Sequence, residues 1–123
     1  MSKIASYKDL IIWQKAMDLA ENIYQITGAF PKAELYSLTD QMRRAAVSVV
    51  SNIAEGKGRD SRQEFLHFLA IAQGSLTELE TQILLSIRLN YFSEDTAAKA
   101  LGLCDEIGRM INSMRTKLKA IPH

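Results

Sequence analysis

Residues 97–118 read AAKALGLCDEIGRMINSMRTKL, and this stretch indicates most clearly how the chain folds. Its apolar and small side chains recur at alternating spacings of three and four residues, which places them along one face of an α-helix. Ser93, followed by the acidic Glu94 and Asp95, precedes the stretch and suits a helix N-terminus. The stripe consists of Ala97, Ala100, Cys104, Ile107, Ile111, Met114 and Leu118. The spacing predicts an amphipathic helix over about 94–119.

Three further segments with the same spacing precede this one, and glycine and proline separate them. They predict helices over about 9–27, 38–56 and 62–90, the second ending at Gly56 and Gly58. The predicted core stripes are Leu10, Trp13, Met17, Ala20, Tyr24 and Thr27 in the first, Leu38, Met42, Ala45, Val49 and Ile53 in the second, and Phe65, Leu69, Ala72, Leu76, Leu79, Ile83 and Ile87 in the third.

Two helix starts carry the signature of a capping box. Ser61 and Glu64 form the usual pair, and Ser37 with Asp40 resembles one with Asp in the Glu position. Alternation with a period of two residues, the mark of a strand, is not found in the sequence. Because the connections are short, neighbouring helices should be antiparallel. We therefore predict an all-α fold, an antiparallel up-down-up-down four-helix bundle in a single domain over 1–123.

The composition is that of one globular domain, with 123 residues, 47% hydrophobic and 24% charged. The N-terminus lacks a signal-peptide core, and no run of about 18 apolar residues is present, so we expect a cytoplasmic protein without a membrane span. The 15 basic and 14 acidic residues leave a charge of +1, which argues against a general polyanion binder. A local basic patch remains compatible with that balance.

Catalytic and metal-binding patterns are weak. One cysteine, Cys104, and two histidines cannot build a cysteine-rich or histidine-rich metal site. Glu64 and His67 have the Glu-x-x-His spacing of bundle di-iron sites, but no second copy exists. Glu78 and Glu80 are two residues apart on a helix and point in different directions, which makes a poor acid/base pair. We expect no enzyme, no cofactor and no metal.

Two stretches, 45–54 and 65–77, contain no charged residue. A bundle helix normally has a charged outer face, and a helix without one is usually covered on both sides. The stretches form either a mildly polar exposed face or a contact with another subunit. The second interpretation is favoured because several apolar residues lie off the core stripes: Val47, Val50, Leu66, Phe68 and Ile71. We expect the chain to self-associate.

Five sequence blocks occur in a familiar order: YKDLIIWQKA over 7–16, FP over 30–31, LTDQMRRAA over 38–46, SNIAEG over 51–56 and AQGSLTELE over 72–80. From about Tyr7 to Lys119 the chain resembles the bacterial four-helix-bundle family encoded in intervening sequences of large-subunit ribosomal RNA genes. The accessory variability determinant of diversity-generating retroelements is similar to the same family. The resemblance implies a homopentamer around a central channel, a nucleic-acid role with RNA or DNA and, for the retroelement relatives, contact with a reverse transcriptase.

The motif blocks also predict a polar network. If the second and third helices form a hairpin that turns near Arg59, Arg44 lies near Gly74 and Ser75 and can pair with Glu78, while Gly74 allows a close helix contact. The network would fix helix register or subunit contacts; the alternative is a catalytic or ligand-binding role. Its expected members are Arg43, Arg44, Asn52, Glu55, Gly74, Ser75 and Glu78.

Two basic clusters are the candidate nucleic-acid-binding residues. The first is Lys57, Arg59 and Arg62 between the second and third helices, and the second is Arg109, Arg115, Lys117 and Lys119 near the C-terminus. Cations at a helix C-terminus also complement the helix dipole, which explains the second cluster equally well. Two hypotheses remain open: an oligomeric nucleic-acid-binding or ribonucleoprotein accessory factor, and an oligomeric protein-interaction scaffold without nucleic-acid affinity.

Overall fold

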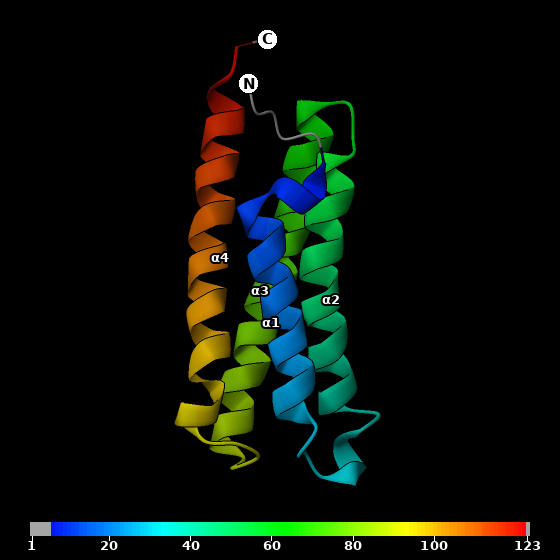
Figure 1. Ribbon diagram of the computed structural model, residues 1–123, viewed down its shortest axis with the longest axis vertical. Coiled ribbons are helices and arrows are strands. Elements are labelled where there is room, and N and C mark those ends of the chain that lie inside the picture. Colours follow the sequence, from blue (N-terminus) through cyan, green and yellow to red (C-terminus); the bar gives the residue numbers. More distant parts are fainter. Residues whose placement is uncertain (1–5, 123) are drawn as a thin grey trace.

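Four amphipathic segments form four long helices that lie side by side (Figure 1). The computed structural model describes residues 6–122. Its elements are η1 (Tyr7–Asp9), α1 (Ile11–Thr27), η2 (Lys32–Glu34), α2 (Leu38–Lys57), α3 (Arg62–Arg88) and α4 (Glu94–Ala120). The prediction of an all-helical four-helix bundle is confirmed. No helix within residues 6–122 has both the length and the apolar character needed to cross a membrane.

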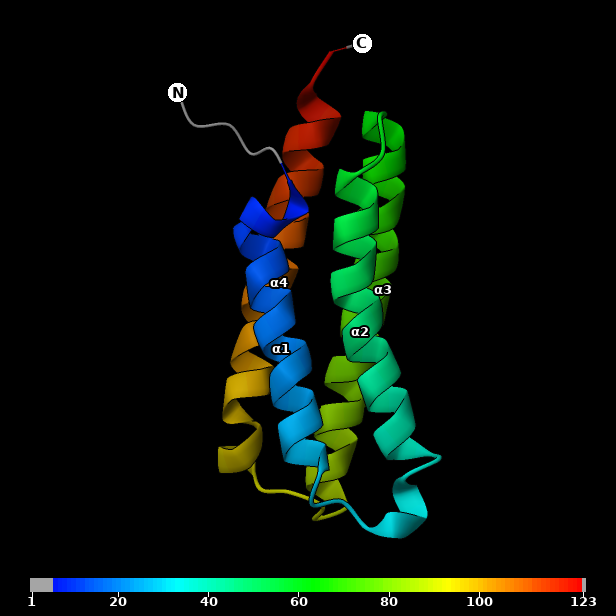
Figure 2. The same cartoon turned by 45° about the vertical axis from the view of Figure 1, so that its right-hand side comes forward.

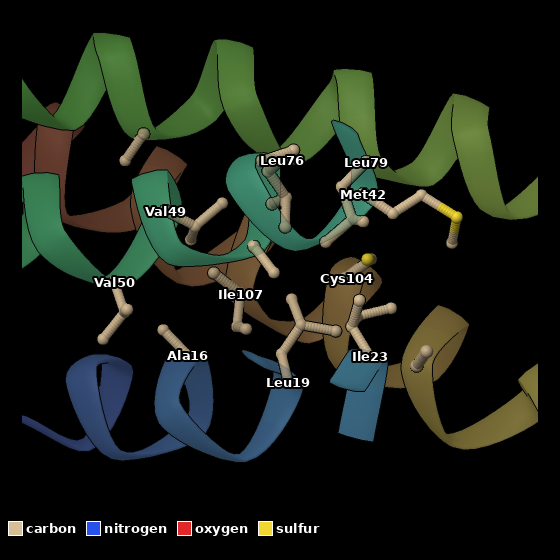
Figure 3. Close-up of a cluster of buried hydrophobic side chains, with 14 of the residues drawn as sticks. Ala16, Leu19, Ile23, Met42, Val49, Val50, Leu76, Leu79, Cys104 and Ile107 are labelled. Carbon is tan, nitrogen blue, oxygen red and sulfur yellow. The ribbon is translucent and has the colours of Figure 1, made fainter. Parts of the chain in front are cut away.

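One core runs through the bundle, and all four helices contribute side chains to it (Figure 3). The stripes predicted for α2, α3 and α4 face this core, with half-buried members at the helix ends, such as Phe65 and Leu118. Cys104 is 3% exposed. Burial, together with the nearby charge of Glu80, raises the pKa of its thiol to about 12. Cys104 therefore packs as a small apolar side chain.

The stripe predicted for α1 is correct only in part, since Thr27 is buried and Leu10, Trp13 and Ala20 pack against the core. Met17 and Tyr24, two of its members, are 45% and 46% exposed. The neighbouring face of α1 supplies most of the core side chains instead, and the buried residues of α1 are Ile12, Ala16, Leu19, Asn22, Ile23 and Thr27. Because α1 carries two adjacent apolar stripes, periodicity alone cannot distinguish them. The stripe with compact aliphatic side chains packs inward, and the stripe with Met and aromatic side chains lies at its flank.

Serine side chains begin α3 and α4 as predicted. The Ser61 hydroxyl accepts a hydrogen bond from the Glu64 backbone N–H at 3.0 Å and donates to the Glu64 carboxylate at 3.3 Å. The Ser93 hydroxyl accepts from the Thr96 backbone N–H at 3.1 Å. Each serine satisfies one of the N–H groups that the first turn of a helix leaves without a partner.

The start of α2 differs from the prediction, because Ser37 makes no side-chain capping bond. The Glu34 carboxylate takes its place and accepts from the Leu38 backbone N–H at 3.4 Å. The Tyr91 hydroxyl donates to the same carboxylate at 2.6 Å, and these bonds lower the pKa of Glu34. Glu34 thus ties the start of α2 to the connection before α4.

The last turn of α2 lies very close to the first turns of α3. Gly56 is helical and buried, and a Cβ built on it would lie 2.7 Å from Phe68 Cβ and 3.0 Å from Phe65 Cδ1. The last turn of α2, at Gly56, therefore lies opposite the second turn of α3. The first turn of α3 consequently extends beyond the end of α2 by about one helical turn. The close contact expected at Gly74 is wrong, since a Cβ there would meet no atom within 4 Å.

The pairing expected for Arg44 is also wrong. Ser75 lies opposite Ser48, with their hydroxyl oxygens 2.8 Å apart, and not opposite Arg44. Arg44 forms an ion pair with Asp40 at 2.9 Å, while Glu78 is exposed. The hairpin register is displaced by about one turn from the expected one, because the contact at Gly56 sets it.

We predict that Gly56→Ala destabilises the protein. The added methyl group meets the Cβ of Phe68, which cannot swing away, and overpacking of this kind costs about 1–3 kcal/mol. Gly102→Ala, at an open helical position in α4, is the matched control and should stabilise by about 0.5–1 kcal/mol. Urea denaturation measures both. Equal stabilisation by the two substitutions would contradict the close approach at Gly56.

Candidate nucleic-acid interface

The turn between α2 and α3 and the C-terminus of α4 lie at the same end of the bundle (Figures 1 and 2). Their contact is direct, because the Arg62 guanidinium donates a hydrogen bond to the Ile121 backbone carbonyl at 2.5 Å. The two residues are 59 positions apart in the sequence. The structure thus brings together parts of the two basic clusters that the sequence places far apart.

This end of the bundle carries more positive than negative charge. We call it the basic end, and its cations are Lys57, Arg59, Arg62, Lys117 and Lys119. The carboxylates close to it in sequence are Glu55, Asp60 and Glu64, which leaves an excess of two positive charges. Lys117 and Lys119 are exposed, so their ammonium groups can reach a ligand in solution.

Two candidates from the C-terminal cluster lie apart from the basic end. The Arg115 guanidinium donates to the side-chain oxygen of Gln73 in α3 at 2.6 Å, and the Gln73 amide donates to Asn112 at 2.8 Å. Arg109 pairs with Asp105, and this hydrogen bond raises the pKa of Arg109. Arg109 and Arg115 therefore have partners within the bundle.

His67 and Phe68 form an aromatic pair that adjoins the basic end, and neither is among the nucleic-acid-binding residues that the sequence predicts. The Arg59 guanidinium lies over the Phe68 ring, 5.0 Å from its centroid. The exposed His67 ring contacts Phe68 edge to face, with centroids 5.7 Å apart. The signal that points to this pair is Gly56, because a buried glycine in a helix permits close contact with an aromatic side chain on the next helix.

A small polar network joins α2 to α3 further from the turn that connects them. The Asn52 amide donates to the Ser48 backbone carbonyl at 2.8 Å, and the Ser48 hydroxyl in turn bonds to Ser75. We call the surrounding surface the outer face, and it comprises Val47, Ser48, Ser51, Asn52, Ile71, Gly74 and Ser75. Val47 and Ile71 are 41% and 39% exposed, and the face contains no charged residue.

Three of the apolar residues expected on this surface are more covered than predicted. Val50 is buried at 7% exposure, and Leu66 and Phe68 are half-buried. Val50 turns inward because α1 packs beside α2 at this position, where its side chain lies next to that of Ala16 (Figure 3). The exposed apolar surface of the hairpin is therefore smaller than the sequence indicates.

Arg43 connects α2 to the C-terminus of α1. Its guanidinium donates to the Thr27 hydroxyl at 3.1 Å and to the Tyr24 carbonyl at 3.3 Å, and it lies 4.7 Å from the centre of the Tyr24 ring. A cation at this position satisfies a terminal carbonyl and complements the helix dipole. Arg43 therefore holds the register between α1 and α2.

The groove between α3 and α4 has a volume of about 230 Å³, and Cys104 and Asp105 are among the residues that line it. Its Cys104 thiol is held in the protonated form, and its Asp105 is paired with Arg109. Across the described part of the chain, no three His, Cys, Asp or Glu side chains gather in a way that could hold a metal ion.

Comparison with known proteins identifies similar chains. The sequence profile of the family described as 23S rRNA-intervening sequence protein matches residues 8–113. A crystal structure of a protein of unknown function, from the S23 ribosomal protein family of Bacteroides thetaiotaomicron, is similar with a TM-score of 0.77. It is 23% identical, and the match covers 85% of this chain and 98% of that one, which shows a shared fold. No curated protein matches the chain.

We predict that Arg115 stabilises the bundle. Arg115→Ala removes the hydrogen bond to Gln73 and should lower the free energy of unfolding by about 1–2 kcal/mol. Lys117→Ala, two residues further on at an exposed position, should change it by no more than about 0.5 kcal/mol. Thermal denaturation of the two variants tests this assignment. A decrease in stability from Lys117→Ala as large as that from Arg115→Ala would refute it.

Proposed function

The chain belongs to the 23S rRNA-intervening sequence protein family, and from that premise and the geometry of the basic end we propose that it is a non-enzymatic, homo-oligomeric protein that binds nucleic acid. The observation that carries the proposal is the contact between Arg62 and Ile121, which combines two basic segments into one surface. A nucleic-acid partner agrees with the ribosomal RNA in the family's description.

Binding at the basic end would be electrostatic. Lys57, Lys117 and Lys119 would neutralise backbone phosphates and release the counterions condensed on them, which makes affinity depend strongly on salt. An excess of two charges per chain is small for this purpose. Tight binding therefore requires that several copies present their basic ends to the same strand, so that the contacts act together.

The outer face is the surface that we propose for contact between copies. Its centre is uncharged, it exposes Val47 and Ile71, and at Gly74 there is open space into which another helix can pack. An exposed apolar surface of this kind is typical of an interface. The resemblance to the retroelement accessory protein implies five copies, and a closed ring would repeat the basic end around one rim.

A second candidate function is an oligomeric scaffold that binds another protein and has no affinity for nucleic acid. The near-balanced total charge, +1 for the chain, favours this alternative. The resemblance implies a reverse transcriptase as one such partner. Because a scaffold would also use the outer face, the two functions differ in the role of the basic end, and a nucleic-acid binding measurement separates them.

We predict that the protein binds a ribosomal RNA fragment at low salt and that its affinity falls steeply as salt is raised. Replacing Lys57, Lys117 and Lys119 together with Ala should weaken binding. It should also reduce the slope of log K against log salt by about one for each phosphate that the variant no longer neutralises. Fluorescence anisotropy over a salt series measures both quantities.

The matched control replaces Lys32, Arg88 and Lys99, which belong to the opposite end of the bundle, with Ala and should bind like the wild type. Absence of binding at low salt would reject the nucleic-acid function in favour of the scaffold. An equally weakened affinity in the control would reject the basic end as the binding surface.

We predict that Ile71→Glu disrupts the oligomer, because a carboxylate would be buried without a partner in the interface. Circular dichroism should still show a helical protein, since Ile71 is 39% exposed in the single chain. Ile11→Glu, at a 60% exposed position on α1, is the control and should leave the assembly intact. Sedimentation velocity gives the mass of each. A monomeric wild type at micromolar concentration, or an unchanged mass for Ile71→Glu, would contradict the proposal.

A further inference from the structure

The Arg59 guanidinium lies over the Phe68 ring at the basic end. Gly56 allows Phe68 to pack against the last turn of α2, so that the ring lies beneath the turn from which Arg59 extends. The guanidinium lies 5.0 Å from the ring centroid. The Arg59 side chain is 43% exposed, so part of it is accessible to a ligand in solution.

The positive charge of Arg59 is partly compensated. Its guanidinium lies 3.8 Å from the carboxylate of Glu55, one helical turn earlier. This pairing weakens Arg59 as a phosphate ligand but leaves its planar surface intact. A guanidinium plane is a surface on which nucleic-acid bases stack.

Arg43 also lies over an aromatic ring, but its surroundings differ from those of Arg59. Arg43 lies over Tyr24, but hydrogen bonds to the Thr27 hydroxyl and the Tyr24 carbonyl tie it to the end of α1, away from the basic end. Arg59 instead lies between Lys57 and Arg62, among the other cations. The position of Arg59 is therefore the one suited to nucleic-acid contact.

His67 adds a second flat surface, which contacts Phe68 as Arg59 does. Its ring is exposed and meets the Phe68 ring edge to face, at an interplanar angle of 68°. Two neighbouring planar groups, one of them cationic, are typical of platforms on which successive unpaired bases stack.

We infer that the basic end selects unpaired nucleotides, with one base stacked on the Arg59 guanidinium and a neighbouring base on His67, while Lys57, Lys117 and Lys119 contact the phosphates. The inference rests on the proposed nucleic-acid function and adds the class of ligand. In a duplex the faces of the bases are already covered by their neighbours, so that this platform cannot reach them. Single-stranded segments therefore bind more tightly than duplexes of the same sequence.

The test compares a short single-stranded RNA that contains 2-aminopurine with its duplex, at low salt, using the full chain. Arg59→Lys keeps the charge and removes the plane, and it should weaken single-strand binding by about tenfold while duplex binding stays unchanged. The change in 2-aminopurine fluorescence on binding should also diminish. His67→Ala should act in the same direction. Arg88→Lys, in the last turn of α3, is the control and should bind both probes like the wild type.

The outcomes separate the inference from the function on which it depends. Binding of both probes with equal affinity, or wild-type single-strand binding by Arg59→Lys, would overturn the stacking platform and leave the nucleic-acid function standing. Absence of binding to either probe would overturn both. A selective decrease in single-strand affinity and in the fluorescence change would support the platform, since a purely electrostatic or structural role for Arg59 would not produce it.

Discussion

The close contact between Gly56 and the side chains of Phe65 and Phe68 is the constraint on which the rest of the structure depends. It sets the register of the α2–α3 hairpin, so that Ser48 meets Ser75. It also makes α3 extend beyond the end of α2. The start of α3 consequently reaches the C-terminus of α4, where Arg62 bonds to Ile121. One glycine thus links the packing of two helices to the arrangement of charge at one end of the bundle.

Charge in this protein acts locally. The total of +1 reflects a near balance, and many of the cations have partners within the bundle, such as Arg43, Arg109 and Arg115. Arg43 satisfies the end of α1, Arg115 connects α4 to α3, and Arg109 pairs with Asp105 within α4. The lysines near the end of α4 are exposed, and the end of α4 lies at the same end of the bundle as the α2–α3 turn. A nucleic-acid function therefore depends on a small surface that gains strength by repetition in an oligomer, and not on the overall charge of the chain.

Two surfaces of the protein would then have separate functions, one in subunit contact and the other in nucleic-acid binding. The outer face is uncharged and suits contact between copies, whereas the basic end has cations and planar side chains and suits a nucleic acid. The outer face is built from the two uncharged runs, and the basic end from the turn between them together with the C-terminus of α4. Because the hydrogen bonds of Asn52, Ser48 and Ser75 hold the two helices in the register set at Gly56, they would keep the two surfaces in a constant relation to one another.

The sequence by itself determined the all-helical class, the bounds of the four helices, the serine caps of α3 and α4 and the core stripes of three helices, because these features depend on the spacing of nearby residues. Only the tertiary structure decided which of two adjacent stripes of α1 faces the core, that Glu34 caps α2, and that Gly56 rather than Gly74 makes the close contact. It also decided which predicted cations come together: Lys117 and Lys119 join Lys57, Arg59 and Arg62, while Arg109 and Arg115 pair elsewhere. The physical reason is that periodicity describes one helix at a time. Register and partner choice arise from packing between helices, whose residues are tens of positions apart in the chain.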